Sequence, residues 1–294
     1  MKKNLFWLAA LMLGISCALW TGCSDDDKTT PEPDPVPPVD TTPIPPVKDT
    51  TWVVKSVRMD DVKNEGFYKE VLLTQTNGKV SSFTVASHSP KGLNGPMRTV
   101  TVARSTGAVT LTYAESETII GKIVYSLNAK GCPTNVKCYG VDEEGDYLTL
   151  ENTYAYNANG MLERIYTLAE MGEDDNGDPI IEEFDLFKVT FAADSTWASC
   201  LASAEEGIIA TCKYSSIKNN YSIDLNMLNV AYSVSEDIDY AILLGLIPAT
   251  SKVLESIDAG EGIITYTPTM DGKRIASVKT KLGKDTANNV VLGY

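Results

Sequence analysis

Residues 99–113 read TVTVARSTGAVTLTY, and this stretch decides the expected fold. Threonine and valine alternate on both sides of Thr106-Gly107, so each flank places its apolar side chains on one face. Such alternation is typical of a half-buried β-strand, and glycine supplies the positive φ that a tight turn requires. The stretch therefore predicts a β-hairpin.

Four further segments repeat this arrangement of two alternating stretches around a glycine-containing turn. They begin near Val71, Ile119, Tyr154 and Ile263. In the first half of the chain the units recur about every 25–30 residues, as consecutive hairpins would. The expected fold is mainly β, with a large curved antiparallel sheet or barrel built from consecutive hairpins over residues 51–294.

One segment departs from the alternating pattern. Ser235, followed by Glu236 and Asp237, precedes a long apolar run that Pro248 ends. A capping serine, early acidic residues and a final proline indicate one short helix near 235–248, which would plug or cover an opening in the sheet. A buried strand is the alternative, because a short apolar run fits both structures.

The first 22 residues have the layout of an export signal. Lys2 and Lys3 precede an apolar stretch over 5–20, which is short for a membrane span. Leu19-Trp20-Thr21-Gly22-Cys23 then resembles the lipobox of bacterial lipoproteins, although Trp20 replaces the usual aliphatic residue. Residues 1–22 are thus expected to be a lipoprotein signal peptide, and Cys23 to be lipidated. An uncleaved anchor or a plain secretory signal is the alternative.

Residues 23–50 have the composition of an exposed tether. Ser24, Asp25, Asp26 and Asp27 resemble the export signal of surface lipoproteins in Bacteroides-type bacteria, although a solvated acidic patch has the same composition. Eight of the chain's 14 prolines follow within 28–50 and favour polyproline II. Such a stalk would reach up to roughly 70 Å. The expected location is the outer membrane, lipid-anchored and facing the cell exterior, with retention on the periplasmic side as the alternative.

Two hairpins carry a family resemblance. YAYNANGML at 154–162 and YTPTMDGKRI at 266–275 resemble the tyrosine–aspartate hairpin repeats of bacterial surface proteins. The C-terminal half, from Leu243 to the hairpin at Tyr266, is similar to a Bacteroides-type surface lipoprotein family, a domain of unknown function described as having a porin-like fold. The resemblance implies a large curved sheet or barrel. It implies no activity.

Charge and motif content argue against several function classes. The formal net charge is −14, which disfavours contact with nucleic acid phosphates. His88 is the single histidine, so a multi-histidine metal site is excluded, and its surroundings predict a solvated loop. No nucleophile elbow, phosphate-binding loop or zinc-protease motif occurs. No catalytic residue, metal or cofactor is therefore expected.

Cysteines and acidic loops leave two questions open. Cys200 and Cys212 flank a predicted turn, so a disulfide could join them across a hairpin, whereas Cys132 and Cys138 lie closer together. Buried free thiols are the alternative for all four. The acidic runs at 142–146 and 173–178 do not match the spacing of a calcium loop and are expected to be solvated turns.

Tyrosines mark the expected ligand site. Tyr154 and Tyr156 share one strand face, and we expect them to line a concavity of the sheet with 235–248 at its rim. The predicted function is a non-catalytic binding or scaffold domain of a surface or outer-membrane lipoprotein, with nutrient or glycan capture as one role. A structural or adhesive protein such as a pilus accessory, and a glycan hydrolase, are the alternatives.

The expected partners follow from the predicted lipid anchor and binding domain. The membrane is contacted through the N-terminal lipid, and the ligand is an unknown extracellular molecule or outer-membrane protein. A transmembrane barrel is disfavoured because Lys122, Lys137, Arg164 and Lys213 interrupt the candidate strands. The 51–294 domain is expected to be monomeric and to need no detergent.

Overall fold

The computed structural model describes residues 51–61, 64–173, 179–203, 208–230, 235–260 and 262–294. The expected signal peptide, the lipidation site Cys23, the acidic run Ser24 to Asp27 and the stalk lie outside these residues. Most of the acidic loop at 173–178 does as well.

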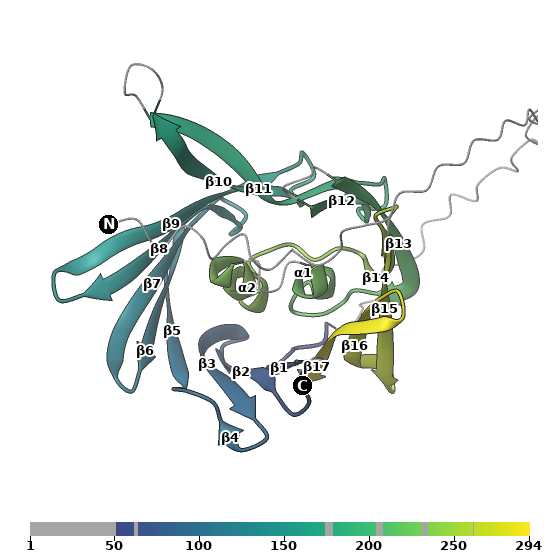
Figure 1. The fold of residues 1–294 in the computed structure, drawn as a ribbon, viewed down its shortest axis with the longest axis horizontal. Helices are drawn as coiled ribbons and strands as arrows, with labels where there is room; N and C mark the ends of the chain where they lie inside the picture. The colour runs from purple at the N-terminus through teal and green to yellow at the C-terminus, as the bar shows by residue number, and fades with distance from the viewer. Residues whose placement is uncertain (1–50, 62–63, 174–178, 204–207, 231–234, 261) are drawn as a thin grey trace, which may run out of the picture. The chain divides into compact units, whose positions relative to one another are not determined.

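Hydrogen-bonded strands make up most of the described chain. Sixteen of them close into an antiparallel barrel, because β1 pairs with both β2 and β17, while the two-residue β4 pairs with β3 only (Figure 1). The strands are β1 (Ser56–Asp60), β2 (Tyr68–Thr76), β3 (Lys79–Ser89), β4 (Gly92–Leu93), β5 (Arg98–Ser105), β6 (Ala108–Glu115), β7 (Thr118–Leu127), β8 (Pro133–Asp142), β9 (Gly145–Tyr156), β10 (Leu162–Glu173), β11 (Pro179–Phe191), β12 (Trp197–Ser203), β13 (Ile208–Lys218), β14 (Lys252–Asp258), β15 (Ile263–Asp271), β16 (Arg274–Leu282) and β17 (Asp285–Gly293).

The hairpins predicted from the alternating segments are confirmed. The pairs β2–β3, β5–β6, β7–β8, β9–β10 and β15–β16 are all antiparallel neighbours. In the first of these turns Asn77 and Gly78 have φ of 53° and 74°. Positive φ at both central residues matches the twist of the flanking strands, which explains why Asn-Gly occurs at this position. Local sequence therefore determines each hairpin.

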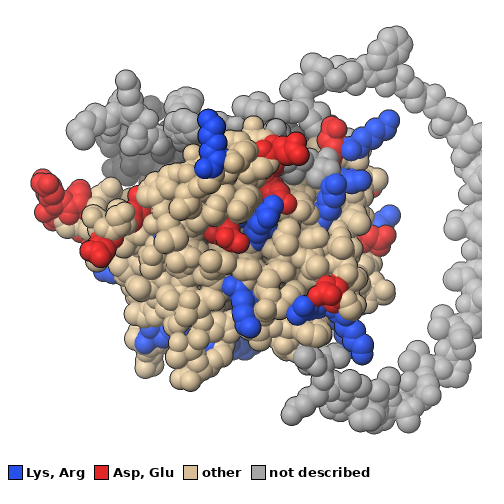
Figure 2. Space-filling view, turned by 90° about the horizontal axis from the view of Figure 1, so that it is seen from below, with Lys and Arg blue, Asp and Glu red and all other residues tan. Residues whose placement is uncertain are grey.

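The two faces of the wall differ in polarity. Along β6 and β7, Leu111 pairs with Ile123 and both are fully buried against the lumen. The alternate residues Thr101, Thr112 and Lys122 form a row across β5, β6 and β7 on the outer face. Figure 2 shows acidic and basic side chains scattered over one side of this outer face. The lumen side is thus apolar, while the outer face mixes polar and charged side chains with exposed apolar ones such as Leu72 and Leu148.

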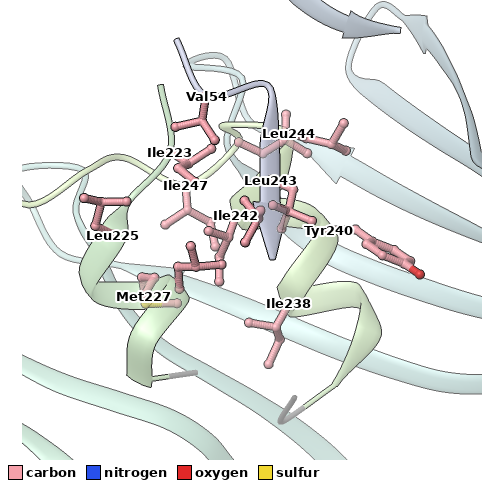
Figure 3. Packing of buried hydrophobic residues seen from close by; sticks show 14 of the residues in the cluster. Val54, Ile223, Leu225, Met227, Ile238, Tyr240, Ile242, Leu243, Leu244 and Ile247 are labelled. Carbon is pink, nitrogen blue, oxygen red and sulfur yellow. The ribbon is translucent and has the colours of Figure 1, made fainter. Parts of the chain in front are cut away.

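Two helices, α1 (Leu225–Val230) and α2 (Glu236–Leu243), lie inside the barrel (Figure 1). The helix expected near 235–248 is α2, and it plugs the lumen. The second helix, α1, was not expected. Figure 3 shows Met227 of α1 and Ile238 and Ile242 of α2 among the buried hydrophobic residues around the two helices. Among the described residues, no helix is long and apolar enough to cross a bilayer.

Strand direction gives the barrel two distinct ends. The turns at 77–78, 106–107 and 128–132 lie at one end, which we call the turn mouth. The connections at 61–67, 116–117 and 143–144 lie at the other end, which we call the loop mouth. The chain enters the lumen from the turn mouth after β13, and α2 returns to it before β14 begins. The plug is therefore a helical hairpin inserted from one side.

Candidate functional site

Buried polar contacts fix the plug to the wall inside the barrel. Asp237 of α2 is fully buried and accepts hydrogen bonds from Tyr154 Oη at 2.9 Å and Asn152 Nδ2 at 3.0 Å. Tyr125 Oη donates to the Asp237 carbonyl at 2.7 Å. At the rim, Arg98 bridges Glu236 of α2 and Glu115 of β6. These contacts join α2 to strands β5, β7 and β9.

The two tyrosines that the sequence selects face the lumen together. Tyr154 is 3% exposed, and its hydroxyl group bonds to Asp237. Tyr156 is half-buried and its hydroxyl oxygen is buried without a hydrogen-bond partner among the described residues. Burial raises the pKa of both phenols above the usual value. Ligand binding by this pair stays a prediction, and only Tyr156 retains a free polar group for it.

A second polar cluster holds the plug at the turn mouth. Asp224 is buried and accepts from the backbone N–H of Asn226 at 2.8 Å and of Met227 at 3.4 Å, as an N-cap of α1 does. Its other oxygen accepts from Thr250 N at 3.0 Å. Burial raises the pKa of Asp224, while hydrogen bonds from Thr250 and Asn226 act against that rise. The cluster ties the start of the plug to its exit.

The first described residues also reinforce this end. Trp52 N donates to Asn220 O at 2.9 Å, and Ser222 N donates to Trp52 O at 2.8 Å. Val54 N donates to Ser222 Oγ at 3.1 Å, and Gln75 Nε2 donates to Val54 O at 3.3 Å. The segment therefore connects the plug entry to strand β2 across the turn mouth.

A pocket of about 430 Å³ lies between the wall and the end of α2 at the turn mouth. Strands β2, β3, β5, β6 and β7 form one side, and the end of α2 with Gly245 forms another. Gly245 has a φ of +64°, and an added Cβ would lie 2.8 Å from Ser222 O. Glycine there lets the chain leave α2 in a left-handed turn close to the plug entry. The pocket therefore forms where the plug ends short of the rim.

Three cationic side chains line this pocket, namely Lys79, Arg104 and Lys130. None of the described residues that line it is acidic. Arg104 follows Val100 and Val102 on the lumen face of β5, and its Nη2 donates to Val80 O at 3.2 Å. Partial burial lowers the pKa of the Arg104 guanidinium below its usual value. In an acidic protein, this pocket is locally basic.

Sequence reasoning missed these three residues. The available signal was the alternation itself, since the positions that carry Val100 and Val102 on the lumen face continue to Arg104. Lys79 and Lys130 each lie at the edge of a turn, where a charged residue is ordinary. Only the closed barrel brings them to one cavity.

His88 lies in a different environment from the one predicted. The prediction of a solvated loop is wrong, because His88 belongs to β3 and stacks on Tyr68 of β2 at 4.4 Å between ring centroids. Its Nε2 lies 3.8 Å from Glu70 Oε2. These side chains border a pocket of about 320 Å³ at the loop mouth. The adjacent Ser87 lines the same pocket, although neighbouring residues of a strand project to opposite faces.

The structure brings together one of the two cysteine pairs. Cys200 on β12 and Cys212 on β13 are free thiols in hydrogen-bond contact, and this contact lowers the pKa of Cys200 and raises that of Cys212. Their disulfide stays a prediction. Cys132, directly before β8, and Cys138, within it, are also free thiols.

Acidic and sulfur ligands do not gather into a metal site in the part of the chain that is described, where no group of three or more histidine, cysteine, aspartate or glutamate residues is placed to hold an ion. In the acidic run 142–146, Asp146 forms an ion pair with Lys122.

Comparisons with known proteins identify the architecture. No family model matches the chain, and no curated protein matches it significantly. The chain is similar to the crystal structure of a porin-like protein from Bacteroides uniformis ATCC 8492, with a TM-score of 0.54 and 15% identity over 82% of this chain and 97% of that one. It is also similar to a porin-like protein from Bacteroides vulgatus ATCC 8482, with a TM-score of 0.51 and 12% identity over 83% and 99%. The expected porin-like fold is thereby confirmed.

Proposed function

We propose that this chain is a lipid-anchored outer-membrane protein whose barrel is a plugged binding module that captures a small extracellular molecule. The observation that carries the proposal is the polarity of the wall. A barrel that spans a membrane has an apolar band outside and a polar lumen. Here ion pairs such as Arg58–Asp60 and Lys137–Glu151 interrupt the apolar residues of the outer face, so the described part of it has no continuous apolar band, while the lumen side is apolar. A barrel of this kind suits water around it.

The N-terminal sequence supports the membrane anchor. A lipid on Cys23 would attach the protein to the bilayer, and Ser24 with Asp25 to Asp27 would direct it to the outer face. The proline-rich stalk would then hold the barrel away from the lipid surface. A protein tethered in this way needs no wall that contacts lipid, which agrees with the ion pairs of the outer face.

The filled lumen favours binding over conduction. A sixteen-strand barrel is wide enough for an aqueous channel, as in porins. In this chain α1, α2 and the side chains around them, including Leu228, Ile238 and Leu243, occupy that space. Among the described residues, two pockets of about 430 and 320 Å³ lie at the mouths, as in a module that holds a ligand.

The chemistry of the pocket at the turn mouth favours capture over hydrolysis. Glycoside hydrolysis uses two carboxyl groups that face each other across the scissile bond. The lining of this pocket, where described, includes lysine and arginine but no carboxylate. Its volume of about 430 Å³ falls within the range of small-molecule sites, about 300–1,000 Å³. A sugar-sized nutrient is the proposed ligand.

A glycan and peptide array followed by product analysis tests the proposal. The full-length protein is expected to retain a ligand without converting it. A Tyr154→Phe/Tyr156→Phe double variant and a Lys130→Gln variant then assign the site, because loss in only one of them places the ligand at the lumen wall or at the turn mouth. Turnover of a hit that is abolished by a single carboxylate substitution would show a hydrolase instead.

A further inference from the structure

The arginine of the turn mouth differs from every other arginine of the chain. Arg58, Arg98, Arg164 and Arg274 each form an ion pair with aspartate or glutamate. Arg104 has no carboxylate partner among the described residues, and its one hydrogen bond, through Nη2, goes to a backbone carbonyl. The other guanidinium nitrogens of Arg104 therefore remain available, in a protein that pairs its arginines elsewhere.

The two lysines of the pocket have no ion pair either within the described segments. Three like charges on one cavity repel one another, and the repulsion is relieved only by solvent or by an anion. The backbone carbonyl groups in the last turn of α2 do little to offset this repulsion between the cationic side chains. The carbonyls of Tyr240, Ala241 and Ile242 already accept from the N–H groups of the turn through Gly245.

From this geometry we infer that the pocket of Lys79, Arg104 and Lys130 at the turn mouth is a binding site for a small organic oxyanion, a carboxylate or phosphate group carried on a sugar-sized body. The inference rests on the proposed binding function and names its ligand class. Arginine presents paired N–H donors that match both groups, and the two lysines add charge without a fixed geometry.

The rest of the lining fits the body of such a ligand. Val109, Leu127, Leu244 and Leu246 border the same cavity and offer an apolar surface to the face of a sugar ring. Gln75 lines it as well, and its amide group can bond to a ring hydroxyl. The protein has a net charge of −14, which repels anions in general. The local basic patch therefore accounts for the selective binding of an anion at this site.

Titration calorimetry on the full-length protein at low ionic strength tests this inference with glucuronate, glucose 6-phosphate, inorganic phosphate and glucose. Glucuronate or glucose 6-phosphate is expected to bind at least tenfold more tightly than glucose, and their relative affinities identify the preferred group. Arg104→Gln is expected to weaken the anion by about tenfold or more, since hydrogen bonds to charged groups contribute that much. Lys130→Gln should weaken it severalfold.

Lys273→Gln is the matched control, because Lys273 also lies in an exposed turn at the turn mouth but outside the pocket. It should leave the affinity unchanged. Circular dichroism verifies that each variant folds. If Arg104→Gln does not fold, the affinity of Lys130→Gln for the anion tests the inference instead. Equal affinity for glucose and the anions, or equal losses in Lys130→Gln and Lys273→Gln, would overturn the inference. A neutral ligand that binds independently of Arg104 would overturn it too, yet leave the proposed capture function standing.

Discussion

Substitution of Asp237 should show how strongly the plug is held by its polar anchor. The carboxylate is fully buried and accepts from Tyr154 Oη and Asn152 Nδ2 at 2.9 and 3.0 Å. In Asp237→Ala both donors stay buried without an acceptor. At roughly 1–3 kcal/mol for each unsatisfied group, the free energy of unfolding should fall by about 2–6 kcal/mol.

The double variant with Tyr154→Phe separates this hydrogen bond from general packing. Tyr154→Phe alone removes one bond to a buried carboxylate and should cost about 1.5–3 kcal/mol. In Asp237→Ala/Tyr154→Phe the unsatisfied hydroxyl is gone, so the combined loss should be smaller than the sum by about 1–2 kcal/mol. Guanidinium unfolding of the 51–294 domain, followed by circular dichroism, measures each value.

Tyr139→Phe on the outer face of β8 is the control and should change stability by less than about 0.5 kcal/mol. Strict additivity of the Asp237 and Tyr154 variants would refute the reasoning. It would mean that the 2.9 Å contact does not join α2 to β9 in solution.

Four other outcomes are expected. Cys23→Ala should abolish fatty-acid labelling and leave a larger precursor, and labelled, processed protein in that variant would disprove the lipobox. Changing Asp25, Asp26 and Asp27 together to Ala should protect the barrel from external protease on intact cells, whereas equal digestion of variant and parent would remove the sorting role. The 51–294 domain should be soluble and monomeric without detergent, as size-exclusion chromatography would show. Gly245→Ala should lower stability by more than Gly283→Ala, because both have positive φ but only the first places a Cβ near a backbone oxygen, with about 1 kcal/mol expected for the conformation alone.

The hairpins could be predicted because their information is local. Alternation around Asn77-Gly78 and Thr106-Gly107 specifies two strands and the turn between them. Closure of the barrel has no such signal, since it depends on pairing of Ser56 in β1 with Gly293 in β17. The helix α1 escaped prediction because six residues are too few to show a helical period.

The site was less predictable than the fold because its residues meet only through register. Tyr154 was correctly placed on a strand, but its partner Asp237 lies 83 positions away. Arg104 precedes a turn, where an arginine is ordinarily solvated. Its orientation toward the lumen follows from its pairing with Val109, two positions from Leu111 on the same face. Neither contact can be deduced from spacing along the chain.

The apolar lumen and the apolar plug require each other. Side chains can fill a barrel of about eight strands, but sixteen leave a space that only further chain can occupy. A helix in that space is buried on all sides, and α2 meets this condition, with Ile238, Tyr240, Ile242 and Leu243 buried and the carboxylate of Asp237 hydrogen-bonded to the wall. Exposing these four side chains would cost roughly 6–12 kcal/mol at 1.5–3 kcal/mol each. That is comparable to the whole stability of a typical domain, so the plug cannot leave without unfolding, and the pocket at its end is preformed.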